Sequence, residues 1–172
     1  GVVLRGIDPK REANVTELGK NITSGQLIDL LTPIKVMQAP ADDPQGAPRL
    51  VEKPGIILGK ELALRLGGFI GDTVNVVSPV GPISAMGMVP KIRTFAVVAL
   101  FHSGMYEYDS SLAYIELGEA QKFFNMAASV SGVEVKVTDV FRAADIARNI
   151  EQELGFSHGA RDWMQMNRNL FS

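Results

Sequence analysis

Residues 78–93 have the sequence SPVGPISAMGMVPKIR and lie between two predicted strands, Thr73–Val77 and Thr94–Leu100. Both flanking runs are rich in β-branched and other apolar residues, which is typical of strands buried on at least one face. The segment between them contains three prolines and two glycines, which exclude a helix. It is also longer than a hairpin turn, which usually has about two to five residues. We therefore expect an irregular connector here.

This connector has more apolar surface than a solvated loop, because it contains Val80, Ile83, Met86, Met88, Val89 and Ile92. Such a segment either packs back on its own domain or projects and is covered by a partner. The general behaviour of loops favours the first alternative. Proline, which stiffens a projecting arm before binding, and methionine, which adapts to varied apolar surfaces, favour the second.

Composition limits the classes of function. Apolar residues make up 46% of the 172 positions, which is enough for the core of one domain or of two small subdomains. The net charge is −2 and no basic block is interleaved with aromatic residues, so nucleic acid is not expected as a partner. The absence of cysteine excludes disulfides and thiolate chemistry. No apolar run is long enough to span a bilayer, and we expect both ends to continue in a longer protein.

Hydrophobic periodicity predicts a chain of alternating strands and helices. In the first part we expect a strand at Val2–Ile7, short helical pieces within Thr16–Leu31, a surface loop at Ala39–Pro54 and a helix at Gly55–Leu66 with Leu58, Leu62 and Leu66 on one face. In the second part we expect a strand at Leu112–Ile115 and a helix at Leu117–Met126 with Ala120, Phe123 and Phe124 inward. After them we expect a half-buried strand at Val133–Val137, a helix capped by Thr138 and ended by Gly155, and a strand at Phe156–Trp163. The last three elements predict a βαβ-like unit.

Candidate catalytic residues are few. His102, Glu107 and Asp109 share one loop and have the chemistry of divalent-metal ligands, but their spacing matches no defined ligand pattern. The serines of this loop are not in a Gly-x-Ser-x-Gly motif. The glycines at 67–71 follow a helix instead of preceding one, which is the wrong order for a phosphate-binding loop. Asp8 and Asp162 are expected to be turn or cap residues. The sequence therefore predicts no catalytic residue, no metal site and no cofactor.

A set of segments resembles the LolC/LolE family of lipoprotein-releasing ABC transporter permeases and, more broadly, the periplasmic domains of MacB-like and FtsX-like permeases. The segments occur in the family's order and cover most of the chain: Gly1–Pro9, Ile57–Ala63, Gly71–Val76, Met86–Lys91, Phe101–Asp109 and Asp162-Trp163.

The resemblance implies an α+β fold, the MacB-like periplasmic domain. A porter-like βαβ subdomain, approximately residues 1–35 and 130–172, would carry an inserted, mixed and mostly β subdomain, residues 36–129, with a projecting hairpin. The chain would be the periplasmic loop between the first two transmembrane helices of an inner-membrane protein.

The resemblance also implies a function without catalysis. The family extracts lipoproteins from the inner membrane, while a separate cytoplasmic subunit hydrolyses ATP. Other partners would be the lipoprotein substrate and a second permease copy. In the LolC branch a hairpin called the hook captures the periplasmic chaperone LolA, and residues 78–93 match it. The implied partner-binding residues are Pro79, Val80, Pro82, Ile83, Met86, Met88, Val89 and Pro90, with Lys91 and Arg93 at the rim.

One departure and two alternatives remain at this point. LolC sequences have a basic residue at the position of Asn75 and a glutamine at that of Ile92, so residues 78–93 would depend more on apolar contact or meet a different chaperone surface. The first alternative is a MacB- or FtsX-like coupler, which transmits ATP-driven motion to another partner. An arm packed on its own domain would favour it. The second alternative is a hydrolase or metal enzyme that uses the loop from His102 to Asp109.

Overall fold

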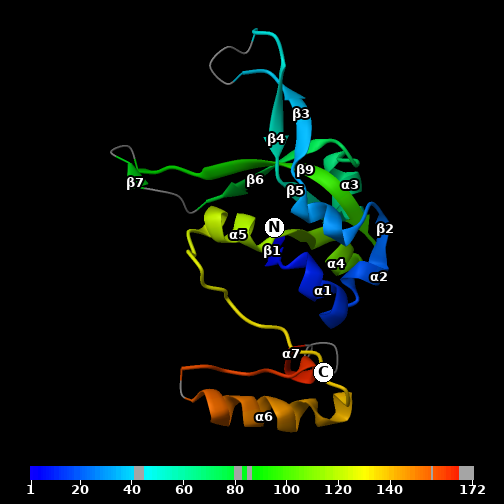
Figure 1. Ribbon diagram of the computed structural model, residues 1–172, viewed down its shortest axis with the longest axis vertical. Helices are drawn as coiled ribbons and strands as arrows, with labels where there is room; N and C mark the ends of the chain where they lie inside the picture. The colour runs from blue at the N-terminus through cyan, green and yellow to red at the C-terminus, as the bar shows by residue number, and fades with distance from the viewer. Residues whose placement is uncertain (41–44, 80–82, 85–86, 156, 167–172) are drawn as a thin grey trace. The chain divides into compact units, whose positions relative to one another are not determined.

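β9 (Lys91–Phe101) is the longest strand described and organises a mixed sheet (Figure 1). β5 (Gly55–Gly59) pairs with it in parallel, while β2 (Ile22–Ser24) and β6 (Thr73–Ser78) pair with it antiparallel. β10 (Leu112–Glu116) lies antiparallel beside β5, and β1 (Val3–Ile7) lies parallel beside β10. The order is therefore β1-β10-β5-β9-β2, with β6 added along the first part of β9.

The computed structural model describes residues 1–40, 45–79, 83–84, 87–155 and 157–166, and only the backbone of residues 83, 84, 87 and 88. The chain divides into two units, Gly1–Val133 and Glu134–Ser172. The sheet lies in the first unit and takes strands from both sides of residue 35. None of the described helices has the length and hydropathy needed to cross a bilayer. The mixed architecture confirms the α+β class, whereas the porter-like and inserted subdomains stay a prediction.

The core of the first unit has two layers of apolar side chains, one on each face of the sheet. Ile57 points to one layer and Ile56 and Leu58 to the other, as expected from the two-residue period of a strand. On one face, α2 (Leu18–Asn21) and the 3₁₀ helix η1 (Leu27–Leu31) cover the sheet. On the other face lie α3 (Lys60–Leu66) and α5 (Leu117–Phe124). Helices α1 (Pro9–Val15) and α4 (Tyr106–Ser111) complete the described helices of this unit.

Two predictions for residues 39–66 are wrong. Residues 56–58 are a strand, not a helix, because they are buried on both faces of the sheet and such strands have unbroken apolar sequences. The spacing of Leu58 and Leu62 fits a helix by coincidence, and only Lys60–Leu66 is helical, ending at Gly67 with a left-handed φ of 63°. The loop predicted at 39–54 contains β4 (Arg49–Lys53), which pairs with β3 (Ile34–Gln38) in a separate hairpin.

The second unit also differs from the prediction. Residues 133–137 and the described residues of 156–163 form no strand, and Val135 is 61% exposed. Their apolar alternation finds no neighbouring strand among the described residues of this unit, and a strand is stable only when paired. Asp139, not Thr138, caps the turn η2 (Val140–Arg142), which leads into α6 (Ala143–Leu154). The helix α6 and its end at Gly155 are confirmed, and α7 (Trp163–Met166) follows Asp162, which accepts a hydrogen bond from the Gln165 amide as the predicted cap.

Gly59 permits a close approach between β5 and α4, and this packing can be tested by Gly59→Ala. An added Cβ would lie 2.2 Å from the Asp109 carbonyl oxygen, so the two elements must separate. Overpacking of this kind typically lowers the free energy of unfolding by about 1–3 kcal/mol. We expect this loss in urea unfolding, with no loss for the control Gly132→Ala, where the added Cβ meets open space. Equal stability of the two variants would contradict this packing.

Candidate functional site

The first part of β9 leaves the body of the sheet and forms an arm with β6. We define the arm as residues 73–96. Its ladder runs antiparallel from the pair Thr73–Ala96 to the pair Ser78–Lys91. β5 begins beside Ala96, so it supports only the later residues of β9. Figure 1 shows the two strands continuing away from the sheet toward β7.

The connector beyond the ladder is not wholly irregular, which corrects the prediction. β7 (Ile83–Ser84) pairs antiparallel with β8 (Gly87–Met88) through the pairs Ile83–Met88 and Ser84–Gly87. Strands this short agree with the prolines and glycines of the segment, because proline has no amide hydrogen for a ladder and glycine favours turns. The connector is therefore a hairpin extension of the arm.

The arm has one face toward the domain and one toward solvent. Val76 and Ser78 alternate with Asn75 and Val77 along β6, so successive side chains point to opposite faces. On the solvent face, Val77 is opposite Ile92, and the two are 57% and 64% exposed. Beside this pair, the Thr94 hydroxyl donates a hydrogen bond of 2.7 Å to Asn75 Oδ1. The solvent face is thus an apolar cross-strand pair next to a satisfied polar pair.

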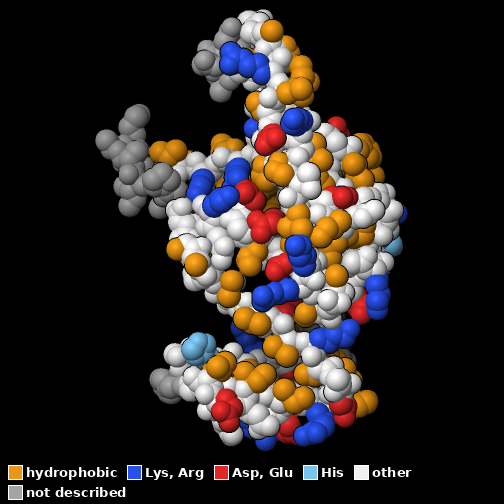
Figure 2. All heavy atoms as spheres, viewed as in Figure 1, with side chains coloured by type: hydrophobic (Ala, Val, Ile, Leu, Met, Phe, Trp, Pro, Cys, Tyr) orange, Lys and Arg blue, Asp and Glu red, His pale blue; other side chains and the backbone are white. Residues whose placement is uncertain are grey.

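The domain face of the arm lies on α5. The Arg93 guanidinium forms an ion pair with the Glu119 carboxylate and donates to the Glu119 carbonyl at 3.4 Å. Lys91 Nζ donates to the Lys122 carbonyl at 3.1 Å and to Asn125 Oδ1 at 3.3 Å, and lies 5.5 Å from the centre of the Phe123 ring. Figure 2 shows basic and acidic side chains gathered where the arm lies on α5.

The predicted partner-binding residues divide into four groups. Pro79, Val89 and Pro90 are exposed near the end of the ladder. Ile83 and Met88 lie in β7 and β8, whereas Val80, Pro82 and Met86 lie outside the described residues. Lys91 and Arg93 are not at a free rim, because both contact α5.

Sequence reasoning omitted two residues of this region. Val77 was available from the alternation of Thr73–Val77, since it shares a face with Asn75. Glu119 gave no such signal, because its contact with Arg93 joins residues 26 positions apart. In α5 itself, Ala120 and Phe123 are buried as predicted. Phe124 is 45% exposed, so the prediction that it also points inward is wrong.

A buried carboxylate holds the segment from His102 to Asp109, which is helical from Tyr106 onward and not a loop throughout as predicted. Asp109 is 1% exposed; its Oδ1 accepts from the Ser103 amide and hydroxyl, each at 2.7 Å, and its Oδ2 lies 2.8 Å from His102 Nδ1. Burial raises the pKa of the Asp109 carboxyl, but the hydrogen bonds from Ser103 and the adjacent His102 outweigh it, so the pKa is below the ordinary 3.8. Within the described ranges, no three metal-ligating side chains are grouped for an ion.

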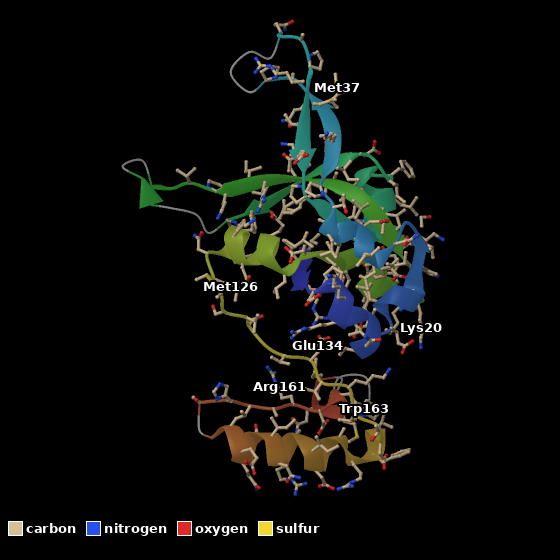
Figure 3. All side chains as sticks on the ribbon, viewed as in Figure 1. Lys20, Met37, Met126, Glu134, Arg161 and Trp163 are labelled. Atoms are coloured by element: carbon tan, nitrogen blue, oxygen red, sulfur yellow. The ribbon has the colours of Figure 1, made fainter. Side chains whose placement is uncertain are left out.

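A second ribbon with apolar exposure is the β3–β4 hairpin. Met37 and Leu50 are opposite each other in its ladder and are 64% and 65% exposed. Figure 3 shows Met37 on this hairpin, which extends in a different direction from the arm. Both ribbons therefore present an exposed apolar cross-strand pair, but among the described residues only the arm has charged side chains, Lys91 and Arg93, that attach it to a helix.

Comparison with known proteins finds relatives that have the same name in different organisms. No family model matches the chain. The lipoprotein-releasing system transmembrane protein LolC of Neisseria meningitidis serogroup B is 32% identical over 175 residues, which cover 99% of this chain and 37% of that protein. LolC of Xylella fastidiosa is also 32% identical, over 173 residues that cover 99% of this chain and 36% of that protein. The chain thus spans little more than a third of the length of these relatives.

Because the Asp109 carboxylate accepts hydrogen bonds from Ser103 and lies next to His102, we expect Asp109→Asn to lower the stability of the domain. The amide cannot accept all three hydrogen bonds in the same way, and loss of bonds to a buried charged group costs about 1.5–3 kcal/mol. We expect a decrease of this size in the free energy of unfolding, and a smaller one for Glu107→Gln, an exposed acid of the same helix.

The same substitution predicts a change in acid sensitivity. Because the pKa of Asp109 is lowered in the native state, its contribution to stability is present above the ordinary value of 3.8 and is lost as the pH falls through the lowered pKa. The unfolding free energy of Asp109→Asn should therefore depend less on pH below about 4. Parallel pH profiles for the two proteins in urea unfolding would contradict this role.

Proposed function

Because this chain belongs to the LolC/LolE family of lipoprotein-releasing ABC transporter permeases, we propose that it is a non-enzymatic periplasmic domain that recruits a lipoprotein chaperone. In this proposal the arm captures a LolA-like chaperone and the transporter passes lipoproteins to it. A separate cytoplasmic subunit hydrolyses ATP. A second permease copy and transmembrane helices outside this chain anchor the domain at the periplasmic face of the inner membrane.

The exposed apolar pair of Val77 and Ile92 is the observation that carries the proposal. Burial of one Ile or Val side chain by a partner contributes roughly 1.5–3 kcal/mol. A chaperone that shields acyl chains from water has apolar surface to offer. Val89 and Pro90 continue the apolar surface past the ladder, toward the hairpin of β7 and β8.

The ladder supports the same proposal through its effect on binding entropy. Six residue pairs hold β6 and β9 in register before any partner arrives. A segment already ordered in its bound form loses less conformational entropy on association. Prolines 79 and 90 flank the extension and restrict its backbone further.

The contact in this proposal is mainly apolar. Lys91 and Arg93 contact α5, and Asn75 is paired with Thr94, so these polar groups already have partners within the domain. Apolar contacts tolerate variation in the partner better than fixed ion pairs do. Because salt screens interactions between charges and not apolar contact, added salt should have little effect on the affinity for the chaperone.

A second candidate function is the MacB- or FtsX-like coupler. The contacts of Lys91 and Arg93 with α5 favour it, because they attach the ladder of the arm to the rest of its own unit. In that case the arm transmits motion and holds no chaperone.

Ile92→Asp tests capture by the solvent face of the arm. A charge at the centre of an apolar contact is costly to bury, so we expect the dissociation constant for the chaperone from the same organism to rise at least about 100-fold. Isothermal titration calorimetry on the purified domain measures it. Met37→Asp is the matched control, because Met37 is also 64% exposed and also lies in a two-stranded ribbon. Unchanged affinity of Ile92→Asp would contradict the proposal.

Replacement of residues 80–89 by a short Gly/Ser turn tests the extension separately. This change keeps the ladder from Thr73 to Ala96 and the contacts of Lys91, so the base of the arm stays folded. We expect capture to fall below detection while the unfolding transition is retained. If the intact domain and the shortened one both fail to bind, the coupler is favoured; equal binding by both would move the contact off the extension.

A further inference from the structure

We propose that α5 is a clamp that fixes the direction of the arm, and that Glu119 is the positioning residue of this clamp. The inference deepens the proposed function, since the direction of the arm matters only if the arm meets a partner. It is carried by contacts between strand β9 and helix α5, which are independent of the residues on the solvent face.

The first attachment is the ion pair of Arg93 with Glu119. The side chains are only 30% and 19% exposed, so the pair is partly shielded from water. Arg93 also donates to the Glu119 carbonyl, and its guanidinium lies 5.5 Å from the centre of the Phe95 ring. Glu119 receives further support, because Lys122 Nζ lies 3.0 Å from its Oε1. Several directed contacts hold an arginine in one geometry far better than a single exposed ion pair does.

The second attachment is Lys91 at the other end of α5. The last carbonyls of a helix lack partners within the helix, and they carry partial negative charge. Lys91 Nζ donates to the Lys122 carbonyl and to the side chain of Asn125, the residue that ends α5. A lysine from the arm therefore caps the C-terminus of α5, and its Nζ lies 5.5 Å from the centre of the Phe123 ring.

Two points of attachment fix the direction of the arm relative to α5, whereas a single point would let the arm rotate about it. Lys91 and Arg93 are two residues apart and lie on the same face of β9. Their partners lie near the start and at the end of α5, at Glu119 and at Lys122 and Asn125. The strand is thus fixed to the helix at two separate points, and rotation of the arm about either one breaks the other.

α5 is well placed to transmit this constraint. It packs on β1 as well, where Gly6 allows the approach: a Cβ at Gly6 would lie 2.3 Å from Ala120 Cβ. The chain leaves the first unit soon after α5, because the second unit begins at Glu134. A displacement of α5 would therefore redirect the arm, while loss of the clamp would free it.

The direction of the arm can be measured without any partner. The chain has no cysteine, so spin labels can be attached to Val77→Cys on the arm and Lys20→Cys on α2 without background labelling. Figure 3 shows Lys20 on the part of the first unit away from the arm. Pulsed electron–electron double resonance then gives the distribution of distances between the two labels. We expect one narrow distribution for the otherwise unaltered domain.

The test compares this distribution with that of the double variant Glu119→Gln, Lys91→Met, which removes the ion pair of Arg93 and the contacts of the Lys91 ammonium and keeps similar side-chain size. We expect the distribution to become roughly twofold wider, with the unfolding transition retained. The exchanged pair Arg93→Glu, Glu119→Arg, in a domain that keeps Lys91, should give a narrower distribution than the double variant does. Arg11→Gln, which breaks the exposed pair with Asp8, is the control and should change nothing. An unchanged distribution in the double variant overturns the clamp.

Chaperone capture by the unlabelled double variant separates the clamp from the proposed function. If the competent direction is populated only part of the time, the apparent dissociation constant rises in proportion, and we expect a rise of roughly 3–10-fold. A wider distribution with no capture by the unaltered domain supports the clamp and contradicts the proposed function. A wider distribution with unchanged capture overturns the role of Glu119 as a positioning residue for capture.

Discussion

The structure depends on one strand that passes through two environments. From Phe95 to Phe101, β9 lies in the core between β5 on one side and β6 and β2 on the other, and nearly all of its side chains are buried. From Lys91 to Thr94 it has β6 as its strand neighbour and an exposed side chain at Ile92. The buried part cannot shift without disturbing close packing on both faces of the sheet. The arm is therefore an extension of the core, and its orientation begins there.

α5 adds the second constraint. A two-stranded ribbon is marginally stable and flexible by itself in water, because it has few neighbours to pack against. Contact of Lys91 and Arg93 with α5 gives one face of the ribbon a folded support. The opposite face stays available, so the same alternation that anchors the arm also exposes Val77 and Ile92. Anchoring and exposure are thus consequences of a single two-residue period.

Local patterns predicted the elements whose signal is contained in neighbouring residues. β1, β6, β9 and β10, the helices α5 and α6, and the ends at Gly67 and Gly155 follow from periodicity and caps. The predictions for residues 56–58 and 133–137 were wrong for opposite reasons. Residues 56–58 were predicted as helix but are a strand with neighbouring strands on both sides. Residues 133–137 have the alternation of a strand but no described partner strand. The clamp was not predictable, because the contact of Arg93 with Glu119 depends on how β9 crosses α5.

Exposed apolar surface alone does not identify a binding site, as the two ribbons demonstrate. Met37 and Leu50 are as exposed as Ile92 and Val77, and a count of exposed apolar residues would rank the hairpin and the arm equally. The difference lies in what holds each ribbon. The arm continues a core strand and is attached to α5 at two points, whereas β3 and β4 pair only with each other among the described strands. Because association must offset the entropy of ordering both partners, an apolar pair on the better-supported ribbon retains more of its burial free energy as affinity.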